Sequence, residues 1–311
     1  MTVPLPQVSS IQCRVPDVFH IGFPRTGTTF LQKGIWSQLS NQIFCTKSRV
    51  GEIYRANSAA ELAGLYDDVP AGSFGNRVFL DTEEEFSGDL FNDYLDVPEK
   101  IASINANAKI IVCLRSQATI IPSLYYLFIK KGNTLTYPDY VRLLTKNRKF
   151  DYLPLLNRYW KFFGKENVLV LMFEDLHRSK GKFVHDVLSF MNIDQSVNID
   201  TDPRVNNASP SPLHTRVLRV INSLTGTTSP TRYMPENERA RVIQRLHLRT
   251  RLSTIPFFFA NKISTYLPNG WFALPVSKMA ALINQTYAES NKELFQALDK
   301  DIEAYEYPGS N

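Results

Sequence analysis

The sequence predicts an α/β protein, a three-layer sandwich in which helices cover both faces of a central, mostly parallel sheet. Short runs of β-branched and aromatic residues alternate with longer segments of helical periodicity. The strand candidates are almost wholly apolar at their centres, which is typical of strands buried on both faces. With 311 residues, 43% of them apolar, the chain can bury about three-quarters of its unfolded surface, enough for one large core.

The individual elements follow from the two periodicities. We expect strands at 17–23, 77–81, 109–115 and 167–173. Helical periodicity falls between and after them, at 26–39, 59–66, 98–105, 120–131, 152–163 and 180–191.

After about residue 198 the pattern changes to helical segments interrupted by prolines. The last of these segments, 277–304, has apolar residues at helical spacing and is expected to pack onto the core. We therefore predict one domain spanning 1–311, with an N-terminal tail at 1–16, an α/β core at 17–198 and a helical C-terminal extension at 199–311.

Residues 22–29 form a glycine-bearing turn between the first strand and a helix. Such a turn directs backbone N–H groups and a helix N-terminus at one point, which suits a phosphate. Its two glycines have the spacing of a Walker A loop, but Thr28 follows Gly27 where that motif has Lys. The cation lies instead inside the loop at Arg25, next to Pro24, which stiffens the turn. The pattern is P-loop-like, but the replacement of that Lys by Thr28 argues against ATP or GTP hydrolysis.

The segment Gly-Phe-Pro-Arg-Thr-Gly-Thr-Thr at 22–29 resembles the 5′-phosphosulfate loop of sulfotransferases that use 3′-phosphoadenosine-5′-phosphosulfate (PAPS). The family usually has Lys at the position of Arg25, and Arg is a common bacterial-type variant. Because guanidinium stays protonated, Arg25 would stabilise charge in the transition state and would not donate a proton. The resemblance implies that the donor is bound by Pro24, Arg25, Thr26, Gly27, Thr28 and Thr29, the last four holding the 5′-phosphate through backbone N–H and hydroxyl groups.

A second anion site is indicated where the strand at 109–115 runs into a helix. Arg115 lies at the carboxyl end of that strand, where ligands bind in open α/β sheets. Thr119 is the expected N-cap, which puts Pro122 in the first turn and Ser123 near the helix N-terminus. An Arg at the strand end with a Ser eight residues later resembles the family's 3′-phosphate site, and an ion pair there would select donors that carry a 3′-phosphate.

The acceptor hydroxyl must lose a proton, so a base is expected near the sulfur. An acidic run after the second predicted strand, ending at Ser87 and Gly88, resembles the family segment Ser-Glu-x-Leu-Ser-Gly. Counting back assigns the base to Glu84, or to a neighbouring Glu if the register slips. A solvated acidic turn is the alternative interpretation. His20 is the second candidate, with a buried core histidine as its alternative.

Two further segments resemble the family more weakly. The segment Arg-Val-Asn-Asn-Ala-Ser at 204–209 resembles a family segment of the form basic-x-Asn-x-Ser, and this resemblance implies that Arg204 and Asn206 close over the nucleotide. Glu174 and Asp175, in a Phe-Glu-Asp-Leu segment, are interpreted as structural groups at a helix start. The chain's ending, 287–308, resembles the family's C-terminal signature, for which we expect a packing role.

Together these resemblances imply a sulfotransferase that moves a sulfuryl group from PAPS to a hydroxyl of a carbohydrate, lipid or other small molecule by in-line transfer. The product would be 3′-phosphoadenosine-5′-phosphate (PAP), and no metal is expected. Two alternatives remain open. A P-loop kinase predicts Lys after Gly27 and a metal-binding Asp on a strand, and a non-catalytic nucleotide-binding module would keep both anion sites without a base.

Composition bounds the partners. The net charge of +5 suits an anionic ligand but lacks the clustering expected of a nucleic-acid surface, and the one dense basic run, 239–251, is typical of the solvated side of an amphipathic helix. No apolar run approaches the roughly 20 residues of a membrane span. The start of the chain lacks the pattern of a signal peptide, so we expect a cytoplasmic protein. The sequence carries no signal for an oligomeric state.

Overall fold

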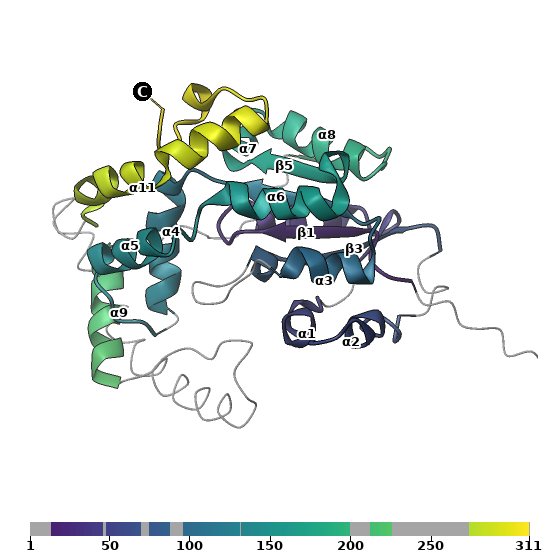
Figure 1. Cartoon of the computed structure of the whole chain (residues 1–311), viewed down its shortest axis with the longest axis horizontal. Helices are drawn as coiled ribbons and strands as arrows, with labels where there is room; N and C mark the ends of the chain where they lie inside the picture. Colours follow the sequence, from purple (N-terminus) through teal and green to yellow (C-terminus); the bar gives the residue numbers. More distant parts are fainter. Residues whose placement is uncertain are drawn as a thin grey trace, which may run out of the picture.

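A parallel sheet of five strands forms the centre of the protein (Figure 1). The computed structural model describes residues 14–45, 48–69, 75–87, 96–130, 132–199, 212–225 and 274–310. Within them the strand order is β2-β3-β1-β4-β5, and every pairing is parallel. The predicted α/β class is confirmed. The strands are β1 Val18–Gly22, β2 Ile43–Cys45, β3 Val78–Glu83, β4 Lys109–Leu114 and β5 Val168–Met172.

Helices connect these strands and extend the chain beyond them. The α-helices are α1 Val50–Arg55, α2 Ala59–Ala63, α3 Val97–Ile104, α4 Gln117–Lys130, α5 Tyr137–Lys146, α6 Tyr152–Phe163, α7 Phe173–Arg178, α8 Lys180–Phe190, α9 Pro212–Thr225 and α11 Val276–Ala297. A π-helical turn, η1 Phe30–Ile35, leads into the 3₁₀ turn η2 Trp36–Gln38, and further 3₁₀ turns are η4 Glu84–Ser87, η5 Lys165–Asn167 and η6 Ile302–Tyr305. Among the described helices, none is both long and apolar enough to cross a bilayer.

Alternation along β1 divides the core between the two faces of the sheet. Phe19 and Ile21 pack into a cluster that includes Leu155 of α6. Val18, on the opposite face, packs with Leu31 of η1 and with α8. Since successive side chains of a strand point to opposite faces, these clusters are the two interfaces of a three-layer sandwich.

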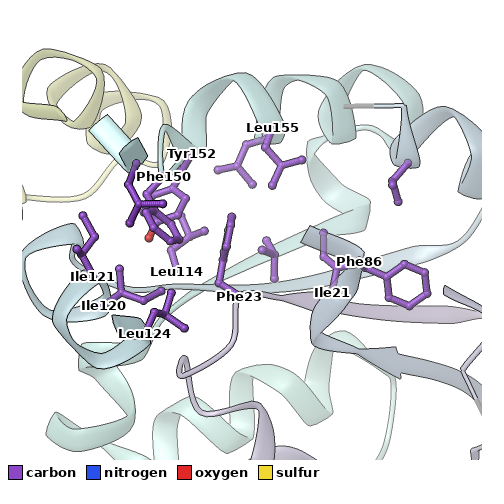
Figure 2. Packing of buried hydrophobic residues seen from close by; sticks show 14 of the residues in the cluster. Ile21, Phe23, Phe86, Leu114, Ile120, Ile121, Leu124, Phe150, Tyr152 and Leu155 are labelled. Carbon is purple, nitrogen blue, oxygen red and sulfur yellow. The ribbon is translucent and has the colours of Figure 1, made fainter. Parts of the chain in front are cut away.

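The residue that follows β1 is anchored by aromatic packing. Phe23 packs against Phe150 and Tyr152 (Figure 2). Its ring centroid lies 5.7 Å from that of Phe150 and 5.1 Å from that of Tyr152. All three side chains are buried. This packing fixes the point at which the chain leaves β1 and enters the turn of the predicted anion site.

The described parts of the C-terminal extension contain α9, α11 and η6, and α11 packs against α4, α5 and α6. A buried amide pair joins α11 to the start of α4. Gln117 Nε2 donates to Asn291 Oδ1 at 2.9 Å, and Asn291 Nδ2 donates to Gln117 Oε1 at 3.1 Å and to the Pro308 carbonyl at 2.9 Å. The expected packing of the last helix onto the core is confirmed, whereas the division into tail, core and extension stays a prediction.

Several sequence-based boundaries were wrong. Strand β2 and helices α1, α5 and α7 were not predicted, and the segment 26–39 holds η1 and η2. Helix α4 begins at Gln117, so Thr119 is not its N-cap: the amides of Thr119 and Ile120 bond to the Ser116 carbonyl at 3.0 and 2.8 Å. Pro122 accordingly lies beyond the first turn. The last helix ends at Ala297 and a separate 3₁₀ turn, η6, follows it.

Candidate functional site

The turn after β1 contains two residues with left-handed backbone. Arg25 has φ 71° and Gly27 has φ 87°. A side chain at Gly27 would be strained by this φ, and its Cβ would lie 2.9 Å from Leu176 Cδ2. The amides of Phe30 and Leu31 bond to the Gly27 carbonyl at 2.9 and 3.2 Å. Helical structure therefore starts directly after the turn, as an anion-binding loop requires.

Two threonine hydroxyls of this loop bond to the protein itself. Thr26 is buried, and its hydroxyl donates to the Phe23 carbonyl at 2.6 Å. The Thr28 hydroxyl donates to a carboxylate oxygen of Glu84. Pro24 and Thr29 are half-buried. Because these two hydroxyls already donate to protein groups, Thr26 and Thr28 can offer an anion their backbone N–H groups.

The ends of β1 and β4 are joined through Arg25, Arg115 and Ser123. Arg25 Nε donates to Ser123 Oγ at 2.9 Å, across 98 positions of sequence. Arg115 Nη1 donates to the Arg25 carbonyl at 2.8 Å, and its Nε donates to Thr119 Oγ1 at 3.0 Å. Three predicted residues from two separate segments thus form one hydrogen-bonded group at the carboxyl edge of the sheet.

Arg115 is held from several sides. Its guanidinium lies over the Phe173 ring, 4.4 Å from the centroid, and the Tyr152 hydroxyl donates to its carbonyl at 2.7 Å. Burial lowers the pKa of Arg115, the Glu174 carboxylate opposes that change, and the Arg25 guanidinium lowers the pKa further. Two like charges are therefore close enough to repel, and an anion bound between them would relieve the repulsion.

Glu84 lies in the turn η4 directly after β3. Ser87 is buried and its hydroxyl donates both to the Gly22 carbonyl, at 2.6 Å, and to the Glu84 carbonyl, at 3.0 Å. The turn is thereby tied to the start of the anion loop. Glu84 is half-buried and accepts from Thr28, whereas the Glu83 carboxylate accepts the Glu84 amide at 3.1 Å. The side chain of the other neighbour, Glu85, lies outside the described part of the structure.

His20 is a core histidine. Its ring is completely buried, lies edge-on to Trp36 at a centroid distance of 4.7 Å, and has Nδ1 3.0 Å from Thr82 Oγ1. Burial lowers the pKa of His20 to about 3. A fully buried ring of this kind is typical of a core histidine, whereas Glu84 is half-buried and contacts the loop through Thr28.

A kinase-like site would need a metal-binding Asp on a strand. Asp81 is such a strand carboxylate, but its contacts are with residues outside the anion loop. It is buried, accepts the Tyr66 hydroxyl at 2.6 Å and the Arg49 amide at 3.2 Å, and has a pKa raised by burial. Its neighbour Thr82, on the opposite face of β3, is the residue that contacts His20. Among the described residues, no group of three His, Cys, Asp or Glu side chains could hold a metal ion.

Sequence reasoning missed the residues that support Arg115. Tyr152 opens α6 and Phe173 follows β5, so both come from segments distant in sequence. The one available signal was the place of Phe173 at the carboxyl end of the strand next to β4, the same edge as Arg115. Arg204 and Asn206, predicted to cover the nucleotide, lie outside the described residues.

Comparisons with known proteins give one family match. A family model described as the sulfotransferase domain matches residues 15–216, more than half of the chain. No curated protein matches the sequence.

Similar solved structures include a sulfotransferase from Alicyclobacillus acidocaldarius, with 18% identity, a TM-score of 0.47, and coverage of 76% of this chain and 95% of that one. A sulfotransferase domain of the curacin biosynthetic pathway has 14% identity and a TM-score of 0.44, with 75% and 98% covered. The mouse sulfotransferase SULT7A1, solved with PAP, has 16% identity and a TM-score of 0.43, with 60% and 62% covered.

The pKa of His20 predicts a definite sign for its effect on stability. It is about 3 in the folded protein against 6.5 ordinarily, so between these values the unfolded chain binds a proton that the folded chain does not. The free energy of unfolding should therefore fall as pH drops through this window, by up to about 1.4 kcal/mol per pH unit from His20 alone. Urea unfolding at a series of pH values should give a shallower dependence for His20→Gln. Equal slopes for the two proteins would show that His20 titrates normally.

Proposed function

Because the chain belongs to the sulfotransferase domain family, we propose that it transfers the sulfuryl group of PAPS to the hydroxyl of a small-molecule, carbohydrate or lipid acceptor by in-line transfer. The released product is PAP. The residues that bind the donor are those of the loop after β1 together with Arg115 and Ser123 at the start of α4.

One observation carries this proposal: two arginines from adjacent parallel strands meet at the carboxyl edge of the sheet. Arg115 donates to the Arg25 carbonyl, and Arg25 donates to Ser123. Each arginine belongs to its own strand–turn–helix unit, so each has a helix N-terminus beside it. Two such sites side by side suit one ligand that carries two separated anionic groups, and PAPS has its 5′-phosphosulfate and 3′-phosphate at opposite ends of one ribose.

In the proposed reaction the protein's main contribution is positioning and charge stabilisation. The loop amides hold the 5′-phosphate, and the Arg25 guanidinium stabilises the charge that develops on the sulfuryl and leaving oxygens. Arg115 binds the 3′-phosphate as a planar, permanently charged donor. Arg25 bonds to Ser123, so the group at the sulfur and the group at the 3′-phosphate are held in one network.

Glu84 is proposed as the general base. It lies after β3, next to the loop, and its carboxylate accepts a hydrogen bond from the Thr28 hydroxyl. The acceptor oxygen gives its proton to Glu84 and forms the new O–S bond. The S–O bond to the 5′-phosphate breaks at the same time, and the electron pair leaves with PAP.

The alternatives fit the site less well. A kinase would need a cationic side chain at Thr28 and a strand carboxylate directed at the loop, and Asp81 instead bonds to Tyr66 and the Arg49 amide. A binding module would need no carboxylate in contact with the loop, and Glu84 makes that contact.

We predict that PAP binds much more tightly than AMP or ATP. Charge-assisted hydrogen bonds from Arg115 to the 3′-phosphate, worth about 1.5–3 kcal/mol, correspond to roughly ten- to hundredfold in affinity. Calorimetric titration of the purified protein with each nucleotide measures this preference. Equal binding of all three would refute the proposed donor.

The same titration has an internal control. Arg115→Ala should bring PAP close to the affinity of AMP, whereas Arg158→Ala, which removes an exposed arginine of α6, should keep the preference for PAP. Loss of the preference in both variants would point to net charge as its source.

Glu84→Gln should lower kcat about a hundredfold or more, since general base catalysis contributes roughly 10²–10⁴. The measurement needs an acceptor, which a screen of sugars, lipids, phenols and peptides with radiolabelled PAPS can supply. PAP affinity should stay close to wild type, because Gln keeps a hydrogen-bond acceptor for Thr28. Glu83→Gln is the matched control and should retain kcat. An unchanged kcat for Glu84→Gln would exclude Glu84 as the base.

A further inference from the structure

Glu174 is a partly buried carboxylate that the proposed chemistry does not use. It lies in the first turn of α7, directly after β5. Its Oε1 accepts the backbone amide of Ser116 at 3.0 Å, although 58 positions of sequence separate them. Ser116 is buried and immediately follows Arg115. The carboxylate is therefore attached to the backbone at the point where β4 ends and α4 is about to begin.

Both polar groups of the peptide bond between Arg115 and Ser116 are bonded to side chains. The carbonyl of that peptide accepts the Tyr152 hydroxyl at 2.7 Å, and its N–H donates to Glu174. Because a peptide unit is planar, two bonds on its opposite edges fix its orientation. That orientation sets the direction in which the Arg115 side chain leaves the backbone.

The next residue is fixed as well. The Ser116 hydroxyl donates to the Glu306 carbonyl, at 3.1 Å, in the C-terminal segment after η6. The start of α4 is thus held by α6, α7 and the C-terminal segment together. This arrangement also explains why the helix begins at Gln117, earlier than its own sequence indicates.

The charge of Glu174 gives a second reason to assign it a positioning role. Its carboxylate raises the pKa of Arg115 against the larger, lowering effect of burial, so the two charges are close. A carboxylate near a phosphate site repels the ligand and by itself weakens binding. Its bond to the Ser116 amide is therefore the contact through which Glu174 could favour binding, since its charge acts against it.

We propose that Glu174 is a positioning residue for the nucleotide site: by accepting the Ser116 amide, it orients Arg115 toward the 3′-phosphate and so sets the preference for donors that carry one. The proposal rests on the proposed function. Glu174, the Glu of the Phe-Glu-Asp-Leu segment, would then affect donor selectivity in addition to its structural role at the start of α7.

The test compares Glu174→Ala with Glu174→Gln. Calorimetry gives the dissociation constants of PAP and AMP for each variant, and their ratio is the readout. Glu174→Ala should reduce the preference for PAP about tenfold, because the guanidinium loses its set direction. Glu174→Gln should keep the ratio near wild type, since the amide oxygen can accept the same N–H. In turnover assays Glu174→Ala should raise KM for PAPS and change kcat little, because the 3′-phosphate is remote from the sulfur.

Asp175→Asn provides the matched control. Asp175 is the adjacent carboxylate of α7, and it accepts the Tyr305 hydroxyl at 3.1 Å without an analogous bond to the Arg115–Ser116 peptide. This variant should keep the wild-type ratio. If Glu174→Ala does not fold, Tyr152→Phe removes the other bond to the same peptide without changing its shape, and it should lower the ratio in the same direction.

The outcomes separate the two proposals. A wild-type protein without preference for PAP contradicts the proposed function. A wild type that prefers PAP, with folded Glu174→Ala equally selective, overturns the role of Glu174 alone. Equal losses in Glu174→Ala and Glu174→Gln also overturn it, since the hydrogen bond would then not be the cause. An unchanged ratio in Tyr152→Phe has the same meaning where Glu174→Ala cannot be measured.

Discussion

The hydrogen bond from the Arg115 guanidinium to the Arg25 carbonyl is the contact on which the site depends. It joins the ends of two adjacent parallel strands and holds a non-glycine residue whose φ is 71°, a conformation that costs roughly 1 kcal/mol or more. It also holds close together two cations that repel each other. Three surrounding contacts hold this pair in place: the packing of Phe23 on Tyr152, the bond from Ser87 to the Gly22 carbonyl, and the bond from Tyr152 to the Arg115 carbonyl.

The sequence predicts the layers of the fold well, because long apolar strands and amphipathic helices leave a strong periodic signal. The four predicted strands occur within a few residues of their expected limits. Strand β2, Ile43–Cys45, was missed because three residues, one of them exposed, are too few for a period to show. The start of α4 was missed for a different reason: contacts from Glu174 and Glu306 to Ser116 determine it, and they override the local preference for Thr119 as a cap.

The candidate site divides in the same way. Glycines, the turn and the strand-end arginine are local patterns, and they are enough to predict Arg25, Arg115 and Ser123 as candidate site residues. The links between segments could not be read from spacing, because the Thr28–Glu84 contact spans 56 positions and the Glu174–Ser116 contact spans 58. The hydrogen-bond partner of a hydroxyl cannot be predicted from the sequence either. The Thr26 hydroxyl donates to the Phe23 carbonyl, where an anion contact was expected. Pairwise contacts of this kind become visible only in the folded chain.

In the proposed donor site, one nucleotide bridges the ends of β1 and β4. A crystal structure of the protein with PAP tests it most directly. The 5′-phosphate should lie against the backbone amides of the turn after β1, and the 3′-phosphate should lie on Arg115 and Ser123. A nucleotide bound with its phosphates reversed, or bound away from Arg115, would show that the two arginines do not form this donor site.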